Sequence, residues 1–362
     1  MQYRTFGNTG VKLSNLGFGA MRLPRDEQQA IAVLRRGFDL GINYVDTAPG
    51  YLDGDSEVFV GKALKDGYRD KVYLSTKNQI LDDSGENWRK RLEDSLRKLD
   101  TDYIDFYHMW GINWKVYQEK IDVPNGPLEA AYKAKEDGLI KHISFSFHDK
   151  PENLFKIIDT GHFESMLVQY NLLDRSNEEA IAYAKSKGLG VAVMGPVGGG
   201  RLGAPSEAII KMIPGGVKST AEAALRFVFA NPNVDVALSG MQSIEMVEDN
   251  VAIASRPTQL STEEIERINA MLEENKRLAD LYCTGCNYCM PCPNGVNIPE
   301  NFRNMNYHRV YQLTDYAKRR YSHLVDRSEH AGACIECGVC EPKCPQKIKI
   351  IEQLKQTAAA LS

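Results

Sequence analysis

The stretch Asn43-Tyr44-Val45-Asp46-Thr47-Ala48-Pro49-Gly50-Tyr51 has the composition of a strand that ends on an acidic residue. Tyr44 and Val45 favour an extended backbone, and Pro49-Gly50 is typical of a turn. We therefore expect Asp46 at the end of a strand and Tyr51 in the loop that follows it. Sheets of parallel strands carry their functional groups at this edge.

Short apolar runs of the same kind recur along the chain, at 16–18, 44–46, 72–77, 104–108, 140–146, 166–169, 190–194 and 236–239. The segments between them have apolar residues at three- and four-residue spacing, which predicts helices at 26–40, 88–99, 127–137, 178–187 and 220–230. Eight repeats of strand and helix predict a (β/α)8 TIM barrel, preceded by a hairpin at 2–14. The alternative, a doubly wound sheet, usually needs fewer units.

The composition is that of a globular protein with room for one large domain and a small appendage, at 362 residues, 43% hydrophobic and 25% charged. Lys plus Arg is 44 against 48 for Asp plus Glu, so no broad cationic surface favours nucleic acid. No apolar run approaches the ~18 residues that span a bilayer, and Met1-Gln2-Tyr3-Arg4-Thr5 lacks a signal pattern. We expect a cytoplasmic protein that binds neither nucleic acid nor membrane.

All eight cysteines lie between Cys283 and Cys344. Clustered cysteines in a chain without a signal pattern indicate a metal site rather than disulfides. The change in composition predicts a barrel domain at 1–275 and a cysteine domain at 276–362. Ser261-Thr262-Glu263-Glu264 is typical of a capping box and predicts a helix that begins there and ends near Lys276.

The cysteine spacing is specific. Cys334-x2-Cys337-x2-Cys340-x3-Cys344-Pro345 is the bacterial ferredoxin pattern, and the earlier run has one residue fewer before its last cysteine. Eight thiolates suffice for two [4Fe-4S] clusters, and in this pattern the fourth cysteine ligates the other cluster. The prediction is one cluster on Cys283, Cys286, Cys289 and Cys344, and a second on Cys334, Cys337, Cys340 and Cys292. The alternative is two zinc sites, which also use paired Cys-x2-Cys. Helical patterns at 299–333 and 347–361 predict a mainly helical ferredoxin-like domain.

Four polar residues lie at or just after successive predicted strands: Asp46, Tyr51, Lys77 and His108. A phenol with a pKa near ~10 is a poor acid at neutral pH unless a nearby ammonium stabilises its phenolate. Lys77 can supply that charge, Asp46 can hold Lys77, and His108 can hydrogen-bond a substrate carbonyl.

Residues 1 to about 260 resemble the aldo-keto reductase family through Asn43 to Ala48, Tyr51, Ser75-Thr76-Lys77 and Asp105-Phe106-Tyr107-His108. The resemblance implies that Asp46, Tyr51, Lys77 and His108 form a catalytic tetrad, with Tyr51 as proton donor while a nicotinamide delivers hydride to a carbonyl. It also implies a nucleotide site made by Gly19, Ala20, Met21, Asp46, Ser146, Gln169, Met194, Pro196, Gly198, Gly200, Leu202, Gly240, Ser243, Asp249 and Asn250.

The nucleotide site departs from the family pattern. Phe147 replaces the usual Asn, and Met194 stands where an aromatic residue often stacks on the nicotinamide. Met241, Gln242 and Met246 occupy positions where Lys or Arg normally bind the 2′-phosphate of NADP, and a phosphate without a cation loses charge-assisted hydrogen bonds. NAD and NADP both remain candidates.

The sequence thus predicts a nicotinamide-dependent oxidoreductase acting on a small carbonyl or alcohol substrate, with two [4Fe-4S] clusters that relay electrons. The alternative is an electron-transfer or partner-binding protein with a vestigial barrel site. A charge run, Arg303, Arg309, Lys318, Arg319 and Arg320, suggests docking of an acidic electron carrier or simply a solvated helix face. Trp110, Trp114 and Tyr117 either wall the substrate site or pack in the core.

Overall fold

The chain folds into two compact units in the computed structural model, which describes residues 1–198, 202, 206–211, 216–256, 261–280, 283, 287–344 and 347–362. The first unit comprises Met1–Gly198 and Ala224–Gln259, and the second comprises Gly199–Ala223 and Leu260–Ser362. The domain boundary predicted near residue 275 falls within helix α11 (Thr262–Asp280) and stays a prediction.

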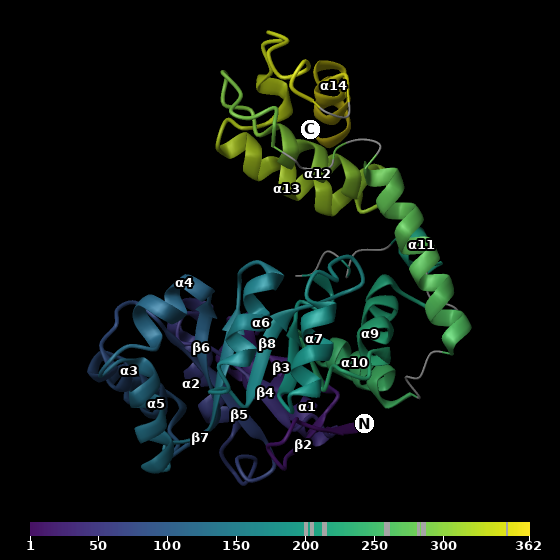
Figure 1. The fold of residues 1–362 in the computed structure, drawn as a ribbon. Helices are drawn as coiled ribbons and strands as arrows, with labels where there is room; N and C mark the ends of the chain where they lie inside the picture. The colour runs from purple at the N-terminus through teal and green to yellow at the C-terminus, as the bar shows by residue number, and fades with distance from the viewer. Residues whose placement is uncertain are drawn as a thin grey trace. The chain divides into compact units, whose positions relative to one another are not determined.

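The centre of the first unit is a closed barrel of parallel strands in the order β10-β3-β4-β5-β6-β7-β8-β9 (Figure 1). The strands are β3 (Leu16–Gly19), β4 (Tyr44–Asp46), β5 (Tyr73–Gln79), β6 (Ile104–Ile112), β7 (Ile140–Phe147), β8 (Ser165–Gln169), β9 (Gly190–Met194) and β10 (Val236–Ser239). Each apolar run predicted as a strand is confirmed as a barrel strand. Closure excludes the doubly wound sheet, because an open sheet would leave two unpaired edges.

Helices pack on the outside of the barrel strands (Figure 1). Along the chain they are α1 (Glu27–Asp39), α2 (Asp55–Ala63), α3 (Gly85–Leu99), α4 (Trp114–Val116), α5 (Pro127–Glu136), α6 (Pro151–Asp159), α7 (Glu178–Ser186), α9 (Thr220–Ala230) and α10 (Ile244–Ser255). The short helix α8 (Glu207–Ile210) belongs to the second unit. The five predicted helices are present as α1, α3, α5, α7 and α9, whereas α2, α4, α6 and α10 lie outside the predicted ranges. The apolar periodicity of α2 is interrupted because Ser56 and Glu57 lie on its buried face.

Local sequence signals set where these helices begin. The side chain of Asp26 accepts a hydrogen bond from the backbone N–H of Gln29 at the start of α1, at 2.8 Å. Ser84 does the same for Asn87 at the start of α3, at 3.2 Å. Such caps satisfy backbone donors that have no partner within the helix, so each helix starts at a defined residue after its strand.

The hairpin formed by β1 (Tyr3–Thr5) and β2 (Lys12–Ser14) precedes the barrel, as predicted. Phe6, which follows β1, is fully buried and packs edge-on against Phe106 of β6, with ring centroids 5.0 Å apart. A side chain at Gly190 would begin 2.8 Å from the Phe6 ring, so only glycine leaves room for this contact. The hairpin therefore supplies part of the barrel core.

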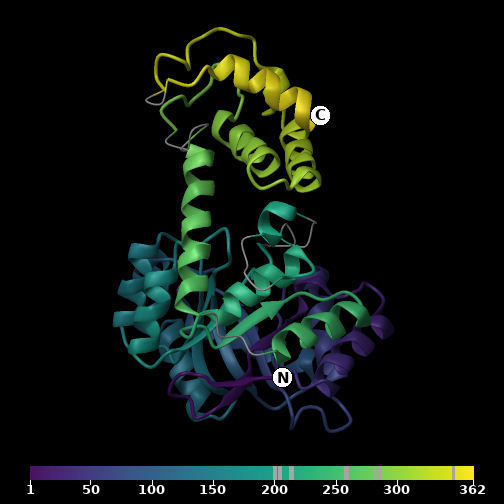
Figure 2. The same ribbon diagram turned by 90° about the vertical axis from the view of Figure 1, so that its right-hand side faces the viewer.

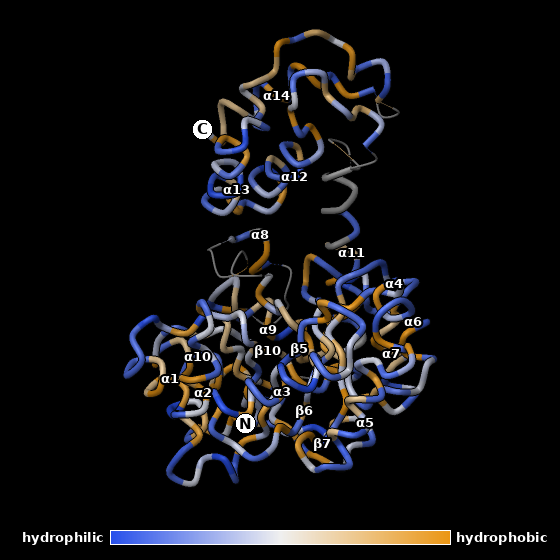
Figure 3. Tube along the Cα trace, turned by 90° about the vertical axis from the view of Figure 1, so that its left-hand side faces the viewer, coloured by the Kyte–Doolittle hydropathy of each residue, from blue (hydrophilic) through white to orange (hydrophobic). Residues whose placement is uncertain are grey.

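The described part of the second unit is mainly helical, as predicted, and contains α11, α12 (Ile298–Arg309), α13 (Thr314–Asp326) and α14 (Ile350–Leu361) (Figure 2). Helices α12 and α13 are largely hydrophilic along their traces (Figure 3). Their buried residues form a small core with α14 that includes Phe302, Tyr321, Leu354, Cys289 and Cys340. Among the described residues, no helix combines the length and the apolar character that a membrane span requires.

Candidate active site and cysteine centre

The four residues of the predicted tetrad come from neighbouring strands of the barrel. Asp46 is the last residue of β4, and Tyr51 opens the short 3-10 helix that follows it. Lys77 of β5 and His108 of β6 are paired in register. Because parallel strands end at one edge of the barrel, the register brings these side chains together.

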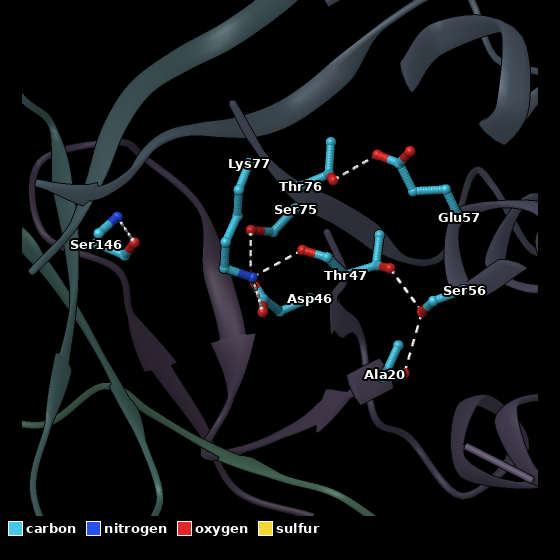
Figure 4. A network of polar contacts seen from close by, with 10 residues as sticks. Ala20, Asp46, Thr47, Ser56, Glu57, Ser75, Thr76, Lys77 and Ser146 are labelled. Atoms are coloured by element: carbon cyan, nitrogen blue, oxygen red, sulfur yellow. Dashed lines mark hydrogen bonds and ion pairs between the residues drawn. The ribbon is translucent and has the colours of Figure 1, made fainter. Parts of the chain in front are cut away.

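Asp46 and Lys77 form a buried ion pair between carboxylate Oδ2 and ammonium Nζ, with 3% and 2% of the two residues exposed (Figure 4). The ammonium also donates to the carbonyl oxygen of Thr47 at 2.7 Å. Ser75 donates from its hydroxyl to the other carboxylate oxygen of Asp46 at 2.9 Å. Burial opposes the charge of Lys77, but Asp46 and Tyr51 outweigh that effect and raise its pKa above the ordinary value. Lys77 is therefore a cation at neutral pH.

Tyr51 lies beside this cation, with the Lys77 nitrogen 4.8 Å from the centre of its ring. Burial raises the pKa of the Tyr51 phenol, Lys77 acts in the opposite direction, and Asp46 adds to the rise. The residue pattern alone indicated only the effect of Lys77. In the folded protein the loss of solvation is larger, so the phenol stays protonated at neutral pH and can act as an acid.

His108 is fully buried, and its ring nitrogens make no hydrogen bond of good geometry with the described residues, while the backbone of Phe145 lies close enough to favour the protonated ring. Burial lowers the pKa of its imidazole to about 4, against the opposing influence of Asp46 and with the support of Lys77. The ring is neutral at pH 7 and retains one N–H donor. A buried donor without a partner is costly, which is the situation expected where a ligand atom completes the hydrogen bond.

A bulge in β6 shapes the wall next to Tyr51. The pairing of β6 with β7 shifts register at 109–112, where Gly111 has a φ of +61°. Gly111 donates its backbone N–H to the hydroxyl of Ser146 at 2.7 Å. The neighbouring Trp110 lies edge-on to Tyr51, with ring centroids 5.8 Å apart. The sequence did not predict this extension of β6.

The aromatic residues predicted for the substrate wall therefore separate into two groups. Trp110 contacts Tyr51, whereas Tyr117 is 2% exposed and stacks on Trp114 with ring centroids 5.5 Å apart. Trp110 belongs to the site, while Tyr117 packs in the core.

The residues predicted to hold the nicotinamide lie at adjacent strand ends. Ser146 of β7 pairs with Leu167 of β8, and Gln169 follows Leu167 by two residues on the same strand. Gln169 in turn pairs with Met194 of β9. Gly195 has a φ of +63°, and a Cβ atom there would lie 2.5 Å from the Gln169 amide. The geometry therefore requires glycine beside this amide. Pro196 and Gly198 continue the turn, in which Gly198 N–H donates to the Gly195 carbonyl at 2.7 Å.

The remaining predicted nucleotide residues are placed as follows. Gly19 ends β3 and Ala20 and Met21 begin the 3-10 helix that follows. Ser243 caps α10 by accepting from Met246 N–H at 3.2 Å, Asn250 donates to the Ser239 hydroxyl at 3.2 Å, and Asp249 is exposed. Leu202 is buried within the second unit, and Gly200 lies outside the described residues.

Arg22 is a residue that the sequence analysis missed. Its aliphatic stem lies against Gly240, where an added Cβ would be 3.2 Å from the Arg22 Cβ. Met241, next to Gly240, is fully buried, and Met246 is exposed on α10. A cationic residue from the 3-10 helix that follows the first barrel strand thus lies at the turn, where the sequence of α10 supplies none. Its only sequence signal was its position directly after Met21.

In the second unit, Cys292, Cys334, Cys337 and Cys340 line one pocket together with Ile298 and Leu354. These four are the cysteines that the sequence groups on one cluster. Burial raises the pKa of the Cys340 thiol, and Cys334 and Cys292 add to that rise. Cys283, Cys289 and Cys344 belong to or pack against the same core, and Cys286 lies outside the described residues.

The donor set of this pocket is suited to a polynuclear cluster. Within the described ranges, no three Cys, His, Asp or Glu side chains converge on a point that could hold a single metal ion. A four-iron cluster separates its thiolate ligands more widely than one zinc ion does, and it uses sulfur ligands at its corners. Four thiols around one pocket supply the number of sulfur ligands that one [4Fe-4S] cluster needs.

The cationic run on α12 and α13 is partly neutralised. Glu300 accepts hydrogen bonds from both Arg303, at 2.8 Å, and Arg320. Arg309 donates to Gln353 of α14 at 2.9 Å. Lys318 and Arg319 are exposed. This surface favours the solvated helix face over a dedicated docking site.

Comparisons with known proteins agree with this geometry. The model of the aldo/keto reductase family matches residues 15–273, and that of the 4Fe-4S dicluster domain matches residues 282–349. The L-galactose dehydrogenase of Arabidopsis thaliana is 30% identical over 77% of this chain and 96% of its own length. The uncharacterized oxidoreductase YqkF of Bacillus subtilis is 26% identical over 76% and 98%.

Solved structures give the same result. The holo form of aldo-keto reductase AKR11C1 from Bacillus halodurans is 31% identical, with a TM-score of 0.66 over 75% of this chain and 96% of that chain. An aldo/keto reductase from Klebsiella pneumoniae, solved with NADP and acetate, is 27% identical, with a TM-score of 0.60 over 74% and 94%. The chain is therefore a member of the aldo/keto reductase family, an oxidoreductase that also carries a 4Fe-4S dicluster domain.

Proposed function

We propose that this oxidoreductase transfers a hydride between a nicotinamide dinucleotide and a small carbonyl or alcohol substrate, with Asp46, Tyr51, Lys77 and His108 as its catalytic residues. The observation that carries the proposal is the buried Asp46–Lys77 ion pair beside the Tyr51 ring. A charged ammonium next to a protonated phenol is what proton donation to a substrate oxygen requires. The neutral His108, with two unpartnered nitrogens, supplies a further donor.

In the reducing direction, the carbonyl carbon gains a hydride, its π bond breaks, and its oxygen takes the phenolic proton of Tyr51. Lys77 stabilises the phenolate that remains, and Asp46 keeps Lys77 charged and oriented. The N–H of His108 holds the substrate oxygen toward Tyr51. A nicotinamide dinucleotide, when bound, supplies the hydride.

The chain's own residues suit that dinucleotide. Ser146 and Gln169 offer a hydroxyl and an amide at neighbouring strand ends, and Gly195 leaves the space that a side chain would fill. The Klebsiella pneumoniae relative was solved with NADP, and Arg22 provides a cation at Gly240. These points favour NADP, while the apolar Met241 and Met246 leave NAD as the other candidate.

The decisive experiment is Tyr51→Phe. The variant keeps the ring and loses the proton, so we expect kcat for carbonyl reduction to fall by about 10²-fold or more, with unchanged binding of NADPH by fluorescence quenching. Titration of the wild type with NADH and NADPH compares the two nucleotides. Unchanged turnover in Tyr51→Phe would refute the proposal.

We further propose that the dicluster domain exchanges single electrons with an external carrier. Each cluster transfers one electron at a time, whereas a nicotinamide transfers two as a hydride, so the matching partner of the clusters is a carrier that itself takes single electrons. Anaerobic reduction of the reconstituted protein with dithionite, followed by addition of an oxidised viologen dye as a one-electron carrier, tests the exchange by visible absorbance and EPR. Reoxidation of the clusters by the dye is expected, and clusters that stay reduced would contradict the proposal. Cluster reduction by a carrier in a chain without carbonyl turnover would instead favour an electron-transfer protein.

A further inference from the structure

Two polar residues lie side by side on the buried face of α2, directly behind the predicted tetrad. Ser56 and Glu57 are both 0% exposed, although they occupy the first turn of a helix. A buried hydroxyl and a buried carboxyl lower stability unless they are hydrogen-bonded. Three of their hydrogen-bond partners, Ala20, Thr47 and Thr76, belong to the segments that carry the candidate active site.

Ser56 connects the first two barrel strands. Its hydroxyl donates to the carbonyl oxygen of Ala20 at 3.0 Å and lies 2.8 Å from the hydroxyl of Thr47. A serine hydroxyl has one proton, and because Ala20 receives it, the proton between the two hydroxyls comes from Thr47. The backbone carbonyl of Thr47 in turn accepts from Lys77 at 2.7 Å (Figure 4). A predicted nucleotide residue and the lysine are thus joined through two hydroxyls.

Glu57 holds the strand that carries the lysine. Its Oε1 accepts a hydrogen bond from the hydroxyl of Thr76 at 2.7 Å. Thr76 lies between Ser75 and Lys77, the two residues that bind the Asp46 carboxylate. Side chains alternate along a strand, so fixing Thr76 on the helix side fixes its two neighbours on the lumen side.

We propose that Ser56 and Glu57 are positioning residues, which hold Ala20, Thr47 and Thr76 so that Lys77 is aimed at Tyr51 in the nucleotide-bound enzyme. The inference rests on the proposed hydride transfer. Neither residue touches the reacting atoms in this arrangement. Ser56 sets the distance between the end of β3 and the carbonyl that receives Lys77, and Glu57 sets the placement of β5.

Charge is the competing way in which Glu57 can act. Burial raises the pKa of this carboxyl, against hydrogen bonds from Thr76 and Ser95 and the cations Lys98 and Lys77. Tyr107 of β6 also faces it, and Glu57 raises the pKa of that phenol. Positioning requires only the oxygen that accepts from Thr76. An amide retains that oxygen and removes the charge, so the two roles are separable.

The test of Glu57 compares Glu57→Gln with Glu57→Leu. We expect the glutamine variant to keep kcat within about twofold and the leucine variant to lose about tenfold, with KM for NADPH little changed in both. The pH at which reduction is lost on the alkaline side should rise only in the leucine variant, because a less well aimed Lys77 stabilises the phenolate of Tyr51 less. The charged or titratable groups that bear on this limb are Asp46, Lys77, His108 and His148.

If Glu57→Leu does not fold, the same hydrogen bond can be removed by changing its donor, Thr76. Thr76→Val removes the same hydrogen bond with little change in shape, and thermal unfolding identifies a folded sample. Equal losses in the glutamine and leucine variants would overturn positioning in favour of charge. A normal pH profile and kcat in folded Thr76→Val or Glu57→Leu protein would overturn it outright.

The test of Ser56 uses Ser56→Ala with Ser56→Thr as the control that keeps the hydroxyl. We expect alanine to weaken NADPH binding and to lower kcat, each by about three- to tenfold, and threonine to restore most of both. Wild-type protein without NADPH- or NADH-linked turnover would refute the proposed function and this inference together. If turnover is lost in Tyr51→Phe but is unchanged in the Ser56 and Glu57 variants, the inference is refuted and the proposed function stands.

Discussion

In the barrel, the polar groups of the candidate site are held by strand register and by one another, whereas in the second unit Cys292, Cys334, Cys337 and Cys340 line a pocket among apolar side chains. Lys77 has an ion-pair partner and a carbonyl acceptor within the barrel. The cysteines are themselves members of a small core. The barrel site is thus stabilised by protein contacts, and the cysteine unit should depend on the cluster its thiolates bind.

The largest expected effect is that of Cys340→Ala. Loss of one of the four thiolates should lower iron from about eight to about four atoms per chain, because each cluster needs its full ligand set. Limited proteolysis should then cut the second unit while the barrel stays intact. Metal analysis and the proteolysis pattern measure both effects.

Val339→Ala, an exposed position in the same loop, is the matched control and should retain all the iron. Full iron content in Cys340→Ala, or zinc in place of iron in the wild type, would contradict the view that the cysteine unit depends on iron-sulfur clusters while the barrel does not.

The next largest effect is that of breaking the barrel's ion pair with Lys77→Met. The substitution leaves Asp46 buried and unpaired, which should lower the free energy of unfolding by about 3–5 kcal/mol and abolish turnover. Asp46→Leu combined with Lys77→Met should regain most of the stability and none of the activity. Chemical denaturation and steady-state kinetics measure the two outcomes. A single variant as stable as the wild type would show that the pair is not desolvated.

The barrel should also carry a pH dependence that originates at His108. Its pKa is about 4 in the folded protein against 6.5 ordinarily, so the unfolded chain binds a proton first as the pH falls. Stability is full above pH 6.5 and declines toward pH 4, by about 3 kcal/mol over the whole window.

Denaturation at several pH values in His108→Asn should show a flatter decline between pH 6.5 and 4.5. The exposed His323→Gln should leave the wild-type slope unchanged. If the free energy of unfolding falls with pH equally steeply in His108→Asn and in the wild type, the imidazole is hydrated in the folded protein.

The smallest expected effect is that of Glu300→Gln on the surface of the second unit. Glu300 binds Arg303 and Arg320 at side chains that are 59% and 45% exposed, where ion pairs contribute little. The free energy of unfolding should fall by no more than about 1 kcal/mol, and NADPH-linked turnover should not change. A large loss of iron in this variant would show that the ion pairs support the cluster.

Much of the fold was predictable because it depends on local patterns. The eight apolar runs are confirmed as barrel strands, and Asp46 ends β4 as predicted, but β5 and β6 continue past Lys77 and His108 to Gln79 and Ile112. Helix α2 was not predicted because its buried face carries Ser56 and Glu57, whose hydrogen-bond partners include Ala20 and Thr76 in distant segments of the chain. The extension of β6 escaped because a bulge at Gly111 has no periodic signature.

The sequence by itself determined where the strands lie along the chain and how the cysteines are spaced, since both depend on residues close together in the chain. Only the tertiary structure decided that His108 is neutral and unpartnered, that Arg22 lies against Gly240, and that Glu300 neutralises two arginines. Those properties depend on burial and on contacts between distant segments. A pKa or an ion pair is a property of the surroundings, and the surroundings exist only after the strands have closed into the barrel and the helices have packed.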